Sequence, residues 1–539
     1  MSAAGEIVSA LGIALRNPGI RRLQIVWGAA IAAEWGHFVA LGVFAYQRGG
    51  TSAVGVAGLV RLLPAAFIAP AAALLGDRFR RERFLLAVTV LGGLALAGSA
   101  AAAAAGLTVA VYVLAALVGL SATLIRPTLQ ALLPSLARTP EELIAANGTS
   151  STVESIGTLA GPLIAGLLVS AATVALALAV WAGVVLAVAA LLLGLKVEGR
   201  GARGEPKAVY RDIAAGLESL VRVPGARLVA GLITAQTFVR GCLNVLIVVA
   251  AFRVLHGGAN AVGYMTAAIG LGGLFGALRA LTLPRDRLGS RFALALVGWG
   301  VPIALIAPLN GLAAAILLLA VLGAANSIED VAGFTLLQRT IPDAVLARTL
   351  GLVWGLAMGT VAVGSAAAPL LVHALGARPS FMIVGAILPV LTVLTYRPLA
   401  ALDRIATPTP ALELLERVPM LAPLSIAAKE RLARSLVAVS VAPGEQVIRA
   451  GDYGDRFYIL ESGTVEVAVD GRQTTMQAPD SFGEIALLRD SPRTATVTAT
   501  AGTRLFALER DAFLAAVTGN TVAHTTGQAV VERRLAKPP

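Results

Sequence analysis

Twelve long apolar segments fill most of the first 396 residues and leave few folds open to the chain. Of the 539 residues, 57% are hydrophobic and only 14% are charged, whereas about a quarter of a soluble globular protein is charged. Each segment is long enough to cross the core of a bilayer as a helix, which takes about 20 residues. The segments cover residues 24–46, 53–75, 84–105, 108–131, 145–169, 174–195, 227–252, 260–283, 291–308, 311–336, 349–373 and 379–396. The sequence therefore predicts an all-α polytopic membrane domain with 12 transmembrane helices in a lipid bilayer.

Most basic residues lie between apolar segments, on one side of this predicted domain. They are Arg78, Arg80, Arg81 and Arg83 in one short connection, and Lys196, Arg200, Arg203, Lys207, Arg211 and Arg222 in the central one. The opposite side has only Arg48, Arg253 and Arg378 near it. By the positive-inside rule, this predicts cytoplasmic N- and C-termini in an inner or plasma membrane. The same distribution accounts for the formal net charge of +12 without nucleic acid as a partner.

An internal repeat divides the membrane domain, residues 1–396, into two parts. Six residues recur at an offset of 208: Phe44, Gly49, Gly50, Ala53, Val54 and Gly55 return as Phe252, Gly257, Gly258, Ala261, Val262 and Gly263. The repeat predicts two parallel six-helix halves, at about residues 20–195 and 227–396, joined by the basic central connection. This architecture resembles the major facilitator superfamily of secondary transporters.

Two short motifs add to that resemblance. The turn at 76–81 is similar to the superfamily's cytoplasmic loop motif, in which an acid and arginines latch the two halves, and residues 286–291 form a weaker counterpart. The pattern at 157–166 resembles a motif of exporters, where small residues let helices approach and a proline bends the helix. The residues expected to act in conformational change are Asp77, Arg78, Arg81, Gly157, Gly161, Pro162 and Gly166. Residues 132–134 (Leu-Leu-Pro) and 146–147 (Ala-Asn) resemble those of the bacterial drug and siderophore exporter branch, which implies efflux and antiport.

Ionisable residues inside the apolar segments are the candidates for transport and coupling, because they are costly there. They are Glu34, His37, Arg126, Arg240, Glu329 and Asp330. The resemblance places their helices around a central cavity. We expect Glu34 to bind a proton or cation, and Arg240 to be its counter-charge or a cargo contact. Structural ion pairing is the alternative role, and Glu154 fits either class.

The composition changes after Tyr396. Residues 397–410 predict a short, semi-rigid linker that ends in Thr-Pro-Thr-Pro. A helical stretch from Ala411 is followed by short alternating strands punctuated by glycines, and residues 509–535 are helical again. The sequence thus predicts a C-terminal α+β domain over residues 411–535, a β-roll with flanking helices.

The segment 482–497 carries the binding chemistry of this second domain. Gly483 allows a close turn, after which the amides of Ile485 and Ala486 can face an anion. The guanidinium of Arg493 fits two phosphate oxygens. The carboxylate of Glu484 would repel a phosphate but suits a ribose hydroxyl.

These residues resemble the phosphate-binding cassette of the cyclic nucleotide-binding domain family. The resemblance implies a cyclic nucleotide as regulatory ligand, with no other cofactor, and a C-terminal helix that closes over the base. The contacting residues would be Phe482, Gly483, Glu484, Ile485, Ala486, Arg493, Thr494 and Ala495. We favour cAMP, although the hydroxyl of Thr494 can also contact the guanine of cGMP.

The sequence predicts a secondary active transporter, a proton-coupled exporter of an unidentified small molecule, that is regulated by cyclic nucleotide and is not an enzyme. The four histidines are too scattered for a metal cluster, and no Walker loop is present. One alternative is a membrane-anchored receptor that no longer transports. Another is a cyclic nucleotide-gated channel, which the two repeats and the lack of a Gly-Tyr-Gly-like filter argue against. An oligomer is compatible with the sequence but not indicated by it.

Overall fold

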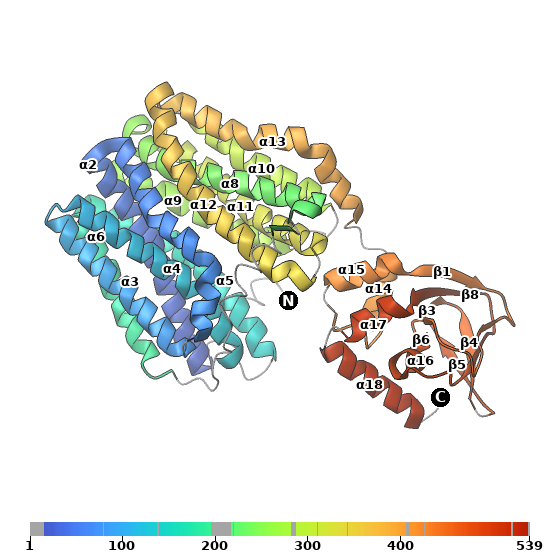
Figure 1. Ribbon diagram of the computed structural model, residues 1–539. Helices are drawn as coiled ribbons and strands as arrows, with labels where there is room; N and C mark the ends of the chain where they lie inside the picture. Colours follow the sequence, from blue (N-terminus) through green and yellow to red (C-terminus); the bar gives the residue numbers. More distant parts are fainter. Residues whose placement is uncertain are drawn as a thin grey trace. The chain divides into compact units, whose positions relative to one another are not determined.

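A computed structural model shows two compact units, Met1–Ile405 and Ala406–Pro539 (Figure 1). The structure describes residues 16–78, 80–136, 140–195, 217–218, 220–281, 287–309, 311–341, 343–405, 410–424, 426–469, 471–518 and 521–536.

Every regular element among the described residues of the first unit is a helix, and 11 of these helices are long and apolar enough to cross a membrane. The first of them, α2 (Pro18–Arg78), has 61 residues and non-helical backbone at Gly49 and Gly50, so it holds two of the predicted spans. Gly50 has a φ of 63° and a ψ of −150°, a region open mainly to glycine. The remaining ten are α3 (Arg81–Ala104), α4 (Thr108–Leu136), α5 (Pro140–Ala171), α6 (Val174–Ala189), α8 (Pro224–Val249), α9 (Gly258–Leu281), α10 (Leu288–Ile306), α11 (Leu312–Thr340), α12 (Asp343–Leu375) and α13 (Ala377–Ile405). The prediction of 12 spans is confirmed.

Two six-helix halves meet along seams lined by small residues. The part of α2 after Gly50 packs on α12, and α5 packs on α9. A Cβ atom added at Gly55 would lie 2.7 Å from the carbonyl oxygen of Ser365, and one at Gly166 would lie 2.9 Å from Cα of Gly263. Glycine at these positions therefore lets the halves approach to backbone contact.

The motif at 157–166 also brings α5 against α2 within the first half. A Cβ atom at Gly161 would lie 2.3 Å from the carbonyl oxygen of Ala32. We expect Gly161→Ala to push the helices apart and to lower the free energy of unfolding by about 1–3 kcal/mol. Thermal unfolding of the purified protein in detergent measures this loss. Gly148→Ala on the same helix is the control, because its added Cβ would meet no atom within 4 Å; an equal loss in both variants would contradict the packing argument.

The second unit contains two four-stranded antiparallel sheets, with strand orders β1-β8-β3-β6 and β2-β7-β4-β5. The strands are β1 (Val437–Val441), β2 (Gln446–Ile448), β3 (Arg456–Ser462), β4 (Thr464–Val469), β5 (Arg472–Gln477), β6 (Ser481–Phe482), β7 (Thr496–Ala499) and β8 (Thr503–Glu509). The helices are α14 (Pro410–Arg417), α15 (Ile426–Ser435), α16 (Glu484–Arg489), α17 (Arg510–Thr518) and α18 (Thr521–Ala536). Buried strand residues such as Leu460, Val465 and Leu505 form one apolar cluster, and the helices enclose a second around Phe457 and Phe513. This arrangement is the predicted β-roll with flanking helices.

The predicted linker is shorter than the sequence indicates. Helix α13 continues to Ile405, so residues 397–405 are helical and only 406–409, which lie outside the described residues, separate it from α14. Leu399 and Leu402 are buried in the core of the first unit. Their packing holds the last turns in helix despite Pro398, because tertiary contacts outweigh local propensity.

Candidate functional site

The turn between β6 and α16 has the geometry that the segment 482–497 predicts. Gly483 has a φ of 95°, which glycine adopts at little cost. A Cβ atom there would lie 2.7 Å from Nη1 of Arg493, so only glycine leaves room for the guanidinium. Ile485 and Ala486 follow in the first turn of α16, where backbone N–H groups have no partner inside the helix.

Arg493 is held in place by the backbone around this turn. Its side chain is buried, Nη1 donates to the carbonyl of Gly483 at 3.0 Å, and Nη2 donates to the carbonyl of Arg456 at 2.7 Å. Burial lowers the pKa of Arg493, and the neighbouring Tyr458 and Asp455 act in the opposite direction. Since a guanidinium has five N–H donors, others are left to bind an anion. The arginine is thus oriented by the protein before any ligand arrives.

Glu484 is fully buried at the start of α16, and the C-terminal helix holds it. Its Oε1 accepts a hydrogen bond from Nη1 of Arg534 on α18 at 2.8 Å. Its Oε2 has no hydrogen-bond partner among the described residues. Buried polar atoms are normally satisfied, so Oε2 is suited to a donor from a ligand, such as a hydroxyl.

We expect Arg534→Ala to loosen both the carboxylate and α18. The change removes a charge-assisted hydrogen bond from a buried acid, which costs about 1–3 kcal/mol. The second unit should melt at a lower temperature, and a ligand that uses Glu484 should dissociate faster. Thermal unfolding and stopped-flow nucleotide release measure the two effects. The control is Arg533→Ala, which removes the neighbouring charge in the last turn of the same helix; equal effects of the two variants would contradict this role.

The remaining residues of the predicted cassette have different surroundings. Phe482 is buried and stacks on Tyr458 with ring centroids 5.4 Å apart, so its ring belongs to the core rather than to an open surface. Ala486 is also buried. Thr494 is exposed beside Arg493, and Ala495 packs partly against the sheet core.

Sequence reasoning missed Arg510, the first residue of α17. Its Nη1 donates to the carbonyl of Gly454 at 3.2 Å, it forms an ion pair with Asp490, and its backbone N–H donates to the carbonyl of Asp455 at 2.8 Å. Arg510 thereby ties the end of α16 to the loop before β3. Nothing in the local sequence signals this role, because the partners come from two other segments.

A partly buried ion pair lies inside the first half of the membrane unit. Nη2 of Arg61 lies 3.3 Å from Oε1 of Glu34, with exposed side-chain fractions of 8% and 34%. His37, one turn further along α2, is fully buried. Glu34 opens into a pocket formed by α2, α3, α4 and α6, which Trp27, Thr89, Ser121 and Val185 also line. Sequence analysis missed Arg61, although the cost of ionisable residues in apolar helices applies equally to it.

The structure pairs Glu34 with Arg61 rather than with Arg240. The guanidinium of Arg240 lies instead over the ring of Trp35, 5.9 Å from its centroid. Consecutive residues of a helix point about 100° apart, because one turn takes 3.6 residues. Glu34 can therefore face the inside of its own half while Trp35 faces the other half.

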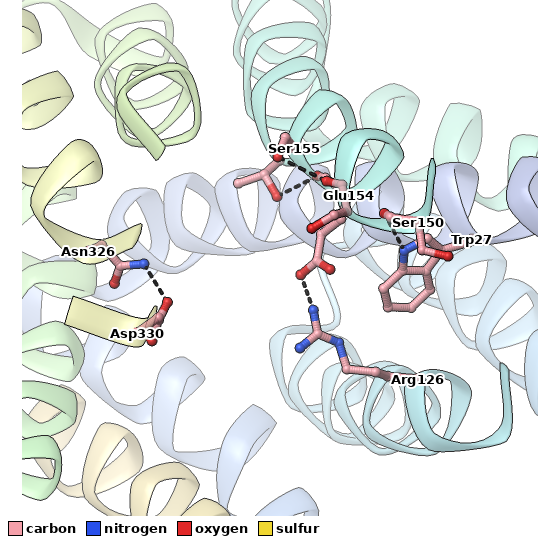
Figure 2. Close-up of polar contacts among 9 residues, drawn as sticks. Trp27, Arg126, Ser150, Glu154, Ser155, Asn326 and Asp330 are labelled. Carbon is pink, nitrogen blue, oxygen red and sulfur yellow. Dashed lines mark hydrogen bonds and ion pairs between the residues drawn. The ribbon is translucent and has the colours of Figure 1, made fainter. Parts of the chain in front are cut away.

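The other predicted charges gather where the two halves face one another. Arg126 forms an ion pair with Glu154, and Nδ2 of Asn326 donates to Oδ2 of Asp330 at 2.9 Å (Figure 2). The charges of Arg126, Glu154 and Arg240 all act on Asp330, which is exposed although it lies within α11. Glu329 beside it is buried, and the charge of Arg240 acts on it as well. The structure thus brings the Arg126–Glu154 pair of the first half close to the charges of Arg240 and Asp330 in the second.

The predicted latch falls partly outside what the structure describes. The side chains of Asp77 and Arg78 are not among the described ones, and neither is residue 79. Beside them, Nε of Arg80 lies 2.7 Å from Oε1 of Glu82, and Arg81 begins α3. The role of Asp77, Arg78 and Arg81 as a latch stays a prediction.

Comparison with known proteins decides the family. A family model described as Major Facilitator Superfamily matches residues 25–353. The chain belongs to the major facilitator superfamily. Its first unit also resembles the solved structure of the nucleoside transporter NupG, with a TM-score of 0.60 and 13% identity over 70% of this chain and 99% of that one. At this identity the likeness concerns the fold alone.

The second unit of this facilitator superfamily member matches a model described as Cyclic nucleotide-binding domain over residues 438–520. The cAMP-dependent protein kinase regulatory subunit of Yarrowia lipolytica is 42% identical over 102 residues, 18% of this chain and 27% of that protein. The same subunit of Dictyostelium discoideum is 41% identical over 110 residues, 19% of this chain and 34% of that protein. The chain thus spans only about a quarter to a third of these relatives. The predicted combination of a facilitator domain with a cyclic nucleotide-binding domain is confirmed.

Proposed function

We propose that this protein is a secondary active transporter, a proton-coupled exporter of a small molecule, whose activity is set by a cyclic nucleotide bound to its C-terminal domain. It would act in an inner or plasma membrane with both termini in the cytoplasm, and it would not be an enzyme. The observation that carries the regulatory part is the cassette, where backbone carbonyls orient Arg493 and Glu484 keeps one carboxylate oxygen for a donor.

The ligand would be cAMP in preference to cGMP. The phosphate would lie against Arg493 and the turn at Gly483, and a ribose hydroxyl would donate to Glu484. The relatives over this region are named as cAMP-dependent protein kinase regulatory subunits. The exposed hydroxyl of Thr494 is compatible with either base.

For transport, we assign different tasks to the two sets of intramembrane charges. Glu34 would bind and release the proton, with Arg61 as the counter-charge of its ionised form. The charges of Arg126, Glu154, Arg240 and Asp330, which come from both halves, would contact the cargo. The split is supported by geometry, because the Glu34–Arg61 pair belongs to one half only.

Two measurements test the proposal. Calorimetric titration of the purified full-length protein should show cAMP binding tighter than cGMP. Inside-out vesicles that contain the protein should accumulate a cargo from a mixture of labelled small molecules when a proton gradient is imposed, and the rate should change with cAMP. The absence of nucleotide binding would refute the regulatory part. Nucleotide binding with accumulation that an uncoupler does not affect would refute proton coupling.

A further inference from the structure

The last turn of α13 is fastened to the N-terminus of α10 by one carboxylate. Oδ1 of Asp403 accepts from the backbone N–H of Gly289 at 2.6 Å, and Oδ2 accepts from the backbone N–H of Ser290 at 3.2 Å. The hydroxyl of Ser290 donates to the same Oδ2 at 2.5 Å. A carboxylate at the positive end of a helix is held by charge as well as by hydrogen bonds.

Close packing supports this carboxylate. A Cβ atom at Gly289 would lie 2.1 Å from the carbonyl oxygen of Leu399, so α10 begins in backbone contact with α13. Leu402 is buried, and its Cδ2 would lie 3.1 Å from a Cβ atom at Gly225, at the start of α8. The end of α13 therefore cannot turn or shift without moving the starts of α8 and α10.

The nucleotide cassette and the first helix of the second unit share one apolar core. Leu487 of α16 and Leu415 of α14 are both buried in the cluster that contains Phe457 and Phe513. In a close-packed core, the displacement of one side chain shifts the side chains in contact with it. A ligand that repositions α16 would therefore change the preferred position of α14.

Only four residues, 406–409, join α14 to Ile405, two positions after Asp403. We propose that Asp403 is a positioning residue for regulation, which converts a displacement of α14 into a displacement of α10 in the membrane unit. The inference rests on the proposed regulation by cyclic nucleotide and names the residue through which it acts. It gives the weak motif counterpart at 286–291 a role, since Gly289 and Ser290 supply the partners of Asp403.

The distribution of tryptophan gives a direct test on the full-length protein. All five tryptophans, Trp27, Trp35, Trp181, Trp299 and Trp354, lie in the membrane unit. Their emission therefore reports on that unit, although cAMP binds to a domain without tryptophan. We expect saturating cAMP to change the emission of the wild type. The change should be lost in Asp403→Ala and reduced in Ser290→Ala, while both variants still bind cAMP by calorimetry.

Three controls frame the result. Arg397→Gln removes an exposed charge from the same end of α13 and should keep the full emission change. A flexible Gly-Ser insertion after residue 407 should abolish the change with Asp403 intact. If Asp403→Ala fails to fold, Ser290→Ala decides, and a full emission change in that variant counts against the inference. Arg493→Ala should weaken binding and reduce the emission change with it.

The outcomes separate the inference from the proposed function. If the wild type does not bind cAMP, the proposed regulation fails and this inference fails with it. If the wild type binds cAMP without an emission change, or if a folded Asp403→Ala keeps the change, this inference is overturned and nucleotide binding stands.

Discussion

Arg493→Ala is expected to lower the affinity for cAMP by roughly 30-fold or more, the largest effect of any single change in the second unit. The guanidinium is the one buried cation of the cassette turn, and two backbone carbonyls hold it there. Its loss would remove the proposed charge-assisted, two-pronged contact with the phosphate. An alanine also releases the turn at Gly483, so the site loses orientation together with charge.

Calorimetric titration of the full-length protein and of the segment 411–539 measures the loss. Arg493→Lys keeps the charge without the planar fork and should fall between the wild type and alanine. The matched control is Arg504→Ala on β8, whose side chain is 64% exposed and pairs with Glu461 rather than with the cassette. If circular dichroism shows that the domain is folded and the affinity of Arg493→Ala is unchanged, Arg493 does not bind the phosphate.

The cassette could be predicted from sequence because its main chemistry lies within one short segment. Gly483 lies in the turn before α16, Glu484 begins this short helix, and Arg493 follows the turn after it, so local structure positions all three. The partner of Glu484 could not be predicted, since Arg534 is 50 residues away and reaches it only through the packing of α18. The contacts of Arg510 could not be predicted for the same reason, because they depend on how three segments fold together.

In the membrane unit, hydropathy predicts the spans but not which side chains meet. The sequence predicts Glu34 as a coupling residue and Arg240 as its counter-charge or a cargo contact, because the expected partner depends on which helices face the central cavity. The structure shows that Glu34 reaches Arg61 of the next span. The sequence predicts that the last membrane helix ends at residue 396, because Pro398 and the charged residues around it are typical of a linker. The helix continues because Leu399 and Leu402 are buried, and this burial depends on tertiary packing.

Glu34→Gln should abolish the dependence of transport on the proton gradient. Glutamine keeps the size and the hydrogen-bonding oxygen of glutamate, but an amide does not bind and release a proton. In the wild type, protonation of Glu34 would cancel the charge that holds Arg61, so the pair would be made in one transport state and broken in the other. A ligand or proton shifts such an equilibrium only through its different affinity for the two states. The variant would be held in one protonation state and could still exchange cargo down its own gradient.

The variant has a predictable side effect that the experiment must separate from uncoupling. Arg61 is only 8% exposed while Glu34 is 34% exposed, so removing the partner of this charge costs at most about 3–5 kcal/mol. The double variant Glu34→Gln with Arg61→Gln removes both charges and should recover most of that stability while it stays uncoupled. Glu218→Gln is the control, since Glu218 forms a comparable pair with Arg222 on an exposed surface. Gradient-driven accumulation in vesicles, with and without an uncoupler, measures coupling, and thermal unfolding measures the cost. If the stable double variant keeps the gradient dependence of the wild type, Glu34 does not carry the proton. Glu329 and Asp330, the acids near Arg240, then become the candidates.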